Sequence, residues 1–127
     1  MSKQTLVIGA SLKPQRYSNI AIHKLIAYHH KVVAIGLRKG LVAGVAILTT
    51  KSEEELCKLS IKNIHTVTLY LNSKRQEAYY NFIISLNPKR VIFNPGTENE
   101  DFYKLLEKNK ILYEVACTLV LLTTSQY

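Results

Sequence analysis

The sequence has 127 residues, of which 47% are hydrophobic, and a formal net charge of +8. A chain of this length lies in the single-domain range, so one domain spanning residues 1–127 is expected, and its hydrophobic share excludes a disordered chain. No apolar run approaches the roughly 20 residues that a membrane span needs. A signal peptide has a positively charged region, then an apolar region, then a cleavage site with small residues. The first residues of this sequence do not follow that pattern, so a cytoplasmic location is expected.

The positive charge is concentrated in the first part of the chain. Residues 1–52 contain eight Lys and Arg and no Asp or Glu, whereas the remainder contains nine of each sign. The whole net charge therefore comes from the N-terminal part, which indicates an anionic partner there. Nucleic acid and a small polyphosphate ligand both remain open at this point.

Strand-like and helix-like segments alternate along the chain. Short apolar runs predict five main strands, at 5–9, 31–36, 65–71, 90–93 and 111–115. A short additional strand is expected at 44–48, inside an otherwise irregular stretch. Helical spacing of apolar residues predicts helices at 19–30, 52–59, 73–86 and 97–109. The apolar segment 118–123 forms an element of open type, and Leu119–Leu122 would either complete the core or cover a homodimer contact.

Several polar residues mark the expected starts of these helices. Ser18 or Asn19 would cap the first helix. The later helices begin at pairs with capping-box spacing, namely Ser52 with Glu55, Ser73 with Gln76, and Thr97 with Glu100. For Thr97 the role of N-cap is a sufficient structural explanation, so any role in ligand binding is secondary.

The alternation predicts βαβ units and right-handed crossovers. The expected fold class is α/β: a Rossmann-like, doubly wound, mostly parallel five-stranded sheet with helices on both faces. Ligands of such sheets bind outside the carboxyl ends of the strands, where the strand order reverses. The loops at that edge are 9–18, 36–40, 72–73 and 94–97.

The loop after the first strand is the best candidate for an anion site. It leads into a helix N-terminus, whose free N–H groups and dipole favour a phosphate. Ser11 and Ser18 add hydroxyls, and Lys13 and Arg16 add positive charge. The structural alternative is that Ser18 only caps the helix and the two cations are solvated. Only the first glycine of G-x-G-x-x-G is present, so the standard dinucleotide fingerprint is not matched.

The loop after the second strand argues against NAD. Proteins that bind NAD usually carry an acidic residue at this position, where it bonds the ribose hydroxyls. This chain has Gly36-Leu37-Arg38-Lys39-Gly40 instead. Two cations could pair with a phosphate on the ribose, which both NADP and coenzyme A possess.

Six segments together resemble the stand-alone CoA-binding domain family of bacteria. They run in order over nearly the whole chain: Val7–Ser11, Lys13–Ser18, Gly36–Gly40, Val67–Asn72, Arg90–Asn99 and Glu114–Val120. The resemblance implies a Rossmann-like fold related to the CoA-binding domain of ADP-forming acyl-CoA synthetases. It implies coenzyme A or an acyl-CoA as the ligand, and it supplies a ligand class rather than a reaction.

The resemblance also implies where the ligand lies. The loop Gly9–Asn19 would meet the phosphates, Arg38 and Lys39 would lie near the adenosine, and the segments after the third and fourth main strands would flank the far side. The expected binding residues are Gly9, Ala10, Ser11, Lys13, Arg16, Tyr17, Ser18, Asn19, Gly36, Arg38, Lys39, Tyr70, Asn72, Asn94, Pro95 and Gly96.

The resulting hypothesis is a coenzyme A-binding domain that is non-enzymatic or regulatory. Residue spacing supports neither a catalytic nor a metal site, and Cys57 and Cys117 are best explained as packing residues. Two alternatives stay open: an NADP-dependent oxidoreductase-like protein, which explains the two loop cations equally well, and a nucleic-acid binder, which explains only the net charge.

Overall fold

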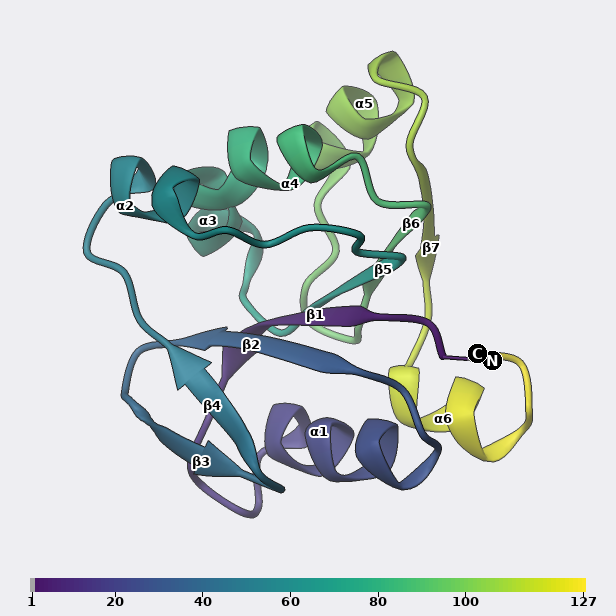
Figure 1. The fold of residues 1–127 in the computed structure, drawn as a ribbon. Helices are drawn as coiled ribbons and strands as arrows, with labels where there is room; N and C mark the ends of the chain where they lie inside the picture. Colours follow the sequence, from purple (N-terminus) through teal and green to yellow (C-terminus); the bar gives the residue numbers. More distant parts are fainter. Residues whose placement is uncertain (1) are drawn as a thin grey trace.

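The computed structural model describes residues 2–127, which form one seven-stranded sheet in the order β3-β4-β2-β1-β5-β6-β7 (Figure 1). All neighbouring strands are parallel except β3 and β4, which are antiparallel. The strands are β1 (Thr5–Ala10), β2 (Val32–Gly36), β3 (Gly40–Val42), β4 (Val45–Leu48), β5 (Thr66–Leu69), β6 (Arg90–Phe93) and β7 (Leu112–Val115).

Helices cover both faces of this sheet (Figure 1). One face carries α1 (Tyr17–Ala27) and α6 (Thr118–Thr123). The other carries α2 (Glu53–Lys58), α3 (Ser73–Gln76), the 3₁₀ turn η1 (Glu77–Tyr79), α4 (Tyr80–Leu86) and α5 (Glu100–Lys108). Within residues 2–127, no helix combines the length and the apolar character that crossing a bilayer would require.

The sheet separates two hydrophobic cores because successive side chains of a strand point to opposite faces. Leu6 and Ile8 of β1 pack with Phe82 and Phe102 under α4 and α5. Val7, between them in sequence, packs into the core beneath α1 and α6. Both faces of β1 are therefore buried, which explains why the strand is a continuous apolar run rather than an alternating one.

The strand order reverses between β1 and β5. After β1 the chain crosses through α1 to β2 on one side, whereas β5 pairs with β1 on the other side and leads on to β6 and β7. Residues 1–52 thus build β1 to β4, a contiguous half of the sheet together with α1. This half carries the whole net positive charge of the chain.

The mostly parallel α/β sheet with helices on both faces is confirmed, but the strand number of five is corrected to seven. The short segment expected at 44–48 is β4, which pairs with β2. Strand β3 was not expected. It has only three residues, and it forms a hairpin with β4 through Ala43 and Gly44, both with positive φ. Three residues are too few to establish a sequence period.

The starts of three helices also differ from expectation. Helix α1 begins after Arg16, which makes no side-chain cap, while Ser18 and Asn19 are buried inside its first turn. The N-cap of α3 is Asn72 rather than Ser73, and the N-cap of α5 is Asn99 rather than Thr97.

Asparagine accounts for the last two corrections. Asn72 accepts a hydrogen bond from the Arg75 N–H at 3.0 Å, and Asn99 accepts one from the Phe102 N–H at 3.2 Å. Because the asparagine carboxamide caps as well as a hydroxyl does, the neighbouring Ser and Thr are left for other contacts. The Ser52 cap of α2 is confirmed by its 3.2 Å bond from the Glu55 N–H.

Candidate functional site

A cleft of about 740 Å³ opens at the carboxyl edge of the sheet, around the switch point between β1 and β5. This volume lies within the roughly 300–1,000 Å³ of typical small-molecule and cofactor sites. Its walls come from the segments after four strands and from the helix after β5. The lining residues are Gly9, Ala10, Ser11, Leu12, Lys13, Arg16, Tyr17, Ser18, Gly36, Leu37, Arg38, Tyr70, Leu71, Asn72, Arg75, Ala78, Tyr79, Pro95, Gly96 and Thr97.

Gly9 allows the floor of this cleft to form. Its φ of +95° is a conformation that side chains disfavour, and a Cβ at this position would lie 3.0 Å from the backbone carbonyl carbon of Tyr70. The end of β1 therefore lies directly against the segment that follows β5. Glycine is required here for two independent reasons, the backbone conformation and the close approach of Tyr70.

The loop between β1 and α1 is held in shape by its own hydrogen bonds. The Ser11 Oγ accepts a hydrogen bond from the Lys13 N–H at 3.1 Å. The buried Asn19 side-chain amide donates a hydrogen bond to the backbone oxygen of Ser11 at 2.9 Å. The Arg16 N–H closes a turn onto the Lys13 oxygen at 3.1 Å. Asn19 thus braces the loop from inside, which explains why it does not line the cleft.

The N-terminus of α1 opens onto the cleft without a side-chain cap. In α2, α3 and α5 a Ser or Asn oxygen accepts a bond from the first turn, whereas in α1 Arg16 forms no such bond and no acidic residue occupies the first turn. Arg16, Tyr17 and Ser18, at this end of the helix, line the cleft, so the positive end of the α1 dipole lies beside it. An oxyanion is the kind of group that such a helix end attracts.

All charged side chains that line the cleft are cations. They are Lys13 and Arg16 from the first loop, Arg38 after β2 and Arg75 in α3. No Asp or Glu between residues 2 and 127 takes part in the lining. A cleft with this charge distribution has a positive potential that favours a polyanionic ligand.

A buried glutamine holds the far wall of the cleft. The side-chain amide of Gln76 donates to the Leu71 oxygen at 2.9 Å and to the Thr97 oxygen at 2.7 Å, while its own oxygen accepts a 2.9 Å bond from Asn99. The segments that follow β5 and β6 are thereby tied to each other and to α3. Spacing suggested a capping role for Gln76, and the structure shows a bridging role instead.

Asn94 lies in a buried polar network rather than in the cleft. Its side chain donates to the Thr68 hydroxyl at 2.6 Å and to the Leu69 oxygen at 2.9 Å, and it accepts a 2.9 Å bond from the Thr118 N–H. Thr68 and Thr118 complete the network with a 2.8 Å bond between their hydroxyls. The side chain is committed to joining β5, β6 and α6.

Two tyrosines contribute neutral hydroxyl-bearing rings to the lining. Burial raises the pKa of Tyr70 to about 12. Burial also raises the pKa of Tyr79, while the nearby charge of Arg75 opposes that rise. Both tyrosines are therefore protonated near neutral pH. The hydroxyl oxygen of Tyr70 is buried, so this group is not available to a ligand in the cleft.

The structure brings together most of the residues expected from the sequence. All of them line the cleft except Asn19 and Asn94, which are internal braces, and Lys39, which is exposed beside it. The expectation missed Arg75 and Tyr79, which lie four residues apart and share one side of the helical segment after Asn72. That i, i+4 spacing is the signal that could have found them.

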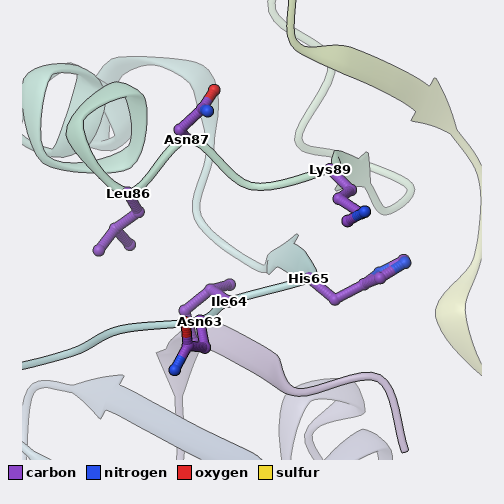
Figure 2. Close-up of a pocket in the computed structure, with 6 residues that line it drawn as sticks. All are labelled: Asn63, Ile64, His65, Leu86, Asn87 and Lys89. Carbon is purple, nitrogen blue, oxygen red and sulfur yellow. The ribbon is translucent and has the colours of Figure 1, made fainter. Parts of the chain in front are cut away.

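A second, smaller cavity of about 380 Å³ lies at the opposite edge of the sheet. Figure 2 shows its two walls, Asn63 to His65 before β5 and Leu86 to Lys89 before β6. In this view the Asn87 side chain points away from the opposite wall. None of the residues expected to bind a ligand lies here.

The fold and the cleft define a doubly wound α/β domain with a cationic cleft at its switch point. Residues 3–123 match the family described as CoA binding domain, and the chain belongs to this family. The resemblance noted from the sequence is thus confirmed. A search of curated proteins found no match.

Several solved structures share the fold. An uncharacterized protein is 39% identical, with a TM-score of 0.89 and coverage of 100% of this chain and 99% of that one. Prb, a protein redesigned for binding, is 18% identical, with a TM-score of 0.81 and coverage of 98% and 84%. A hypothetical protein from Pyrococcus horikoshii OT3 is 25% identical, with a TM-score of 0.77 and coverage of 94% and 80%.

Proposed function

We propose that this protein binds coenzyme A or an acyl-CoA in the cleft at the switch point, as a binding or regulatory domain rather than as an enzyme. One observation carries the proposal: the uncapped N-terminus of α1 opens into a cleft whose charged lining residues are all cationic. Membership of the CoA binding domain family supplies the ligand class.

In this proposal the pyrophosphate of coenzyme A lies against the first loop. Ser11, Lys13, Arg16 and Ser18 line that part of the cleft, at the N-terminus of α1. Main-chain amides combined with charged donors form the strongest hydrogen bonds that a phosphate accepts. This is the most cationic part of the lining.

The adenosine 3′-phosphate is assigned to Arg38. This residue follows β2, the neighbour of β1, and Gly36 lets the two strand ends approach closely because a Cβ there would lie 2.3 Å from the Ala10 oxygen. A phosphate beside Arg38 therefore lies next to the first loop. Exposed Tyr17 and Leu37 flank this end of the cleft and offer surface on which an adenine could stack.

The pantetheine arm then extends to the other side of the switch point. Tyr70 and Asn72 after β5, followed by Pro95 and Gly96 after β6, form this part of the lining. These groups are uncharged, as suits an arm of amides and methylenes. The strand order β2-β1-β5-β6 thus matches the order of adenosine, pyrophosphate and arm.

Isothermal titration with coenzyme A, dephospho-CoA and NADP tests the proposal. Coenzyme A is expected to bind more tightly than dephospho-CoA. Arg38→Met should lower the affinity for coenzyme A about tenfold, because it removes one charge-assisted contact with the 3′-phosphate. It should lower the affinity for dephospho-CoA much less. Lys39→Met is the matched control: it removes a neighbouring charge that does not line the cleft, and it should change either affinity less than about twofold.

Three results would overturn the proposal. Absence of both heat and thermal stabilisation with coenzyme A at about 1 mM would exclude ligand binding of the proposed kind, since a bound ligand stabilises the folded state. Tighter binding of NADP than of any CoA species would favour the oxidoreductase-like alternative. Steady release of free thiol from acetyl-CoA, followed with a thiol reagent, would show that the domain is an enzyme.

A further inference from the structure

One cation of the cleft has no role in the assignment above. Arg75 lies in α3, on the opposite wall from the first loop, and lines the cleft. The backbone N–H of Arg75 donates the hydrogen bond that Asn72 accepts as the N-cap of α3. The guanidinium takes no part in this cap. No carboxylate among residues 2–127 forms a salt bridge with Arg75. A guanidinium offers five donors in a planar fork that matches an oxyanion.

Tyr79 lies beside Arg75 on the same wall. The two residues are one helical turn apart, both line the cleft, and the ring of Tyr79 packs against the core beneath α4. The charge of Arg75 opposes the effect of burial on the Tyr79 pKa. A charged donor and a neutral donor thus share one position on the wall.

This pair lies on the other side of the first loop from Arg38, beside the segment that follows β5. Arg38 follows β2, whereas Arg75 and Tyr79 follow β5, and β1 with its phosphate loop lies between these two strands. A ligand whose phosphates occupy the first loop and Arg38 therefore directs its opposite end toward the side of the cleft that Arg75 lines. In an acyl-CoA, that opposite end is the acyl group.

We propose that Arg75 and Tyr79 recognise a carboxylate on the acyl group, so that the domain prefers acyl-CoA thioesters of dicarboxylic acids. This inference rests on the proposed binding of coenzyme A in the same cleft. The guanidinium pairs with the terminal carboxylate in bidentate fashion, and the tyrosine hydroxyl donates one further hydrogen bond. The uncharged lining around Asn72 and Pro95 provides no other cation for that group.

Matched thioester pairs test the preference by isothermal titration. Succinyl-CoA is compared with butyryl-CoA and malonyl-CoA with propionyl-CoA, because each pair has the same number of acyl carbons and differs in the carboxylate. The thioesters are checked by chromatography after each titration. The dicarboxylic member of each pair is expected to bind about threefold or more tightly than its partner, the range of a partly exposed ion pair.

Three variants assign the preference to these side chains. Arg75→Met should abolish it, Arg75→Lys should restore part of it, and Tyr79→Phe should reduce it without loss of coenzyme A binding. Lys74→Met is the matched control, since Lys74 is an exposed cation at the adjacent position and does not line the cleft. It should leave the preference unchanged, which separates a specific contact from the general positive field.

The outcomes separate this inference from the proposed function. If coenzyme A binds but the thioester pairs do not differ, or the preference survives in Arg75→Met, the inference is wrong and the proposed function stands. Equal loss of the preference in Lys74→Met also overturns it. If Arg75→Met lowers the affinity for coenzyme A more than the affinity for dephospho-CoA, Arg75 contacts the 3′-phosphate instead and the inference is wrong. If no CoA species binds, both proposals fail together.

Discussion

The side-chain amide of Gln76 donates a 2.7 Å hydrogen bond to the backbone oxygen of Thr97, a residue 21 positions away in the chain. Because the same amide also bonds the Leu71 oxygen, one fully buried side chain joins the two segments that form the far wall of the cleft. The shape of that wall, and not only its stability, therefore depends on a residue that does not line the cleft.

Replacement of Gln76 by Met should lower both stability and affinity. The substitution keeps the size of the side chain but leaves the Leu71 and Thr97 oxygens without their donor, at a cost of about 2–3 kcal/mol in the free energy of unfolding. Coenzyme A should bind several-fold more weakly. Denaturant unfolding and isothermal titration measure the two effects.

Gln126→Met is the control for this prediction, because Gln126 is exposed and surface substitutions usually change stability by less than about 0.5 kcal/mol. A Gln76→Met protein as stable as the wild type would contradict the bridging role.

Gly9→Ala should be much more destabilising than Gly44→Ala. Both glycines have positive φ, +95° and +80°, so both substitutions incur the cost of placing a Cβ in that conformation. Only at Gly9 does the new methyl group meet backbone, 3.0 Å from the Tyr70 carbonyl carbon, whereas nothing lies within 4 Å at Gly44. In denaturant unfolding, the free energy of unfolding of Gly9→Ala should be about 1–3 kcal/mol lower than that of Gly44→Ala. Equal stabilities would mean that the strand end can move away from Tyr70.

Asn94→Ala should affect stability and leave ligand contacts intact. The side chain is only 2% exposed, and its loss leaves the Thr118 N–H without its acceptor and removes one of the two hydrogen bonds of the Thr68 hydroxyl. A loss of about 2–4 kcal/mol is expected in the free energy of unfolding. At a temperature where the variant is fully folded, its affinity for coenzyme A should be within about twofold of wild type. Weaker binding of coenzyme A with an unchanged free energy of unfolding would show that Asn94 acts in ligand binding.

His30 should make the protein less stable in mild acid. Its Nδ1 accepts a 3.0 Å hydrogen bond from the Lys3 N–H, and its pKa is lowered, first by burial and then by the charge of Lys3. Because the folded-state pKa lies below the unfolded value of 6.5, the unfolded chain binds the proton more readily, and stability decreases as the pH falls below about 6.5. The thermal midpoint should therefore fall between pH 7.5 and 5.5.

His30→Gln should flatten that decline, and the exposed His23→Gln, as the control, should leave it unchanged. Part of the decline should persist in His30→Gln, because the pKa of His65 is also lowered, mainly by burial. A steeper decline in His30→Gln than in the wild type would contradict this account.

The sequence predicted the layout of the fold and most of the cleft because both depend on local patterns. A buried parallel strand such as β1 is a continuous apolar run, and the edge where ligands bind follows from alternation of strands and helices. Gly9, Ser11 and Arg38 could be assigned to one site because each lies at or just after the end of a strand at that edge.

What the sequence could not predict depends on contacts between distant segments. Asn94 and Asn72 both follow strands, but only the folded chain shows that one is enclosed beneath α6 and the other faces the cleft. Gln76 has capping-box spacing, yet its amide bridges two backbone oxygens instead. A polar residue next to a strand end can bind a ligand or brace a loop, and its type alone does not distinguish these roles.

The uneven placement of charge has a kinetic consequence. The basic half of the sheet, β1 to β4 with α1, lies beside a half with no net charge. The molecule therefore has a large electric dipole moment. Its field extends beyond contact range in dilute salt and is screened within roughly 10 Å at 0.1 M ionic strength. A polyanion such as the proposed ligand should therefore be oriented by this field before contact, and its association rate should decrease steeply with added salt.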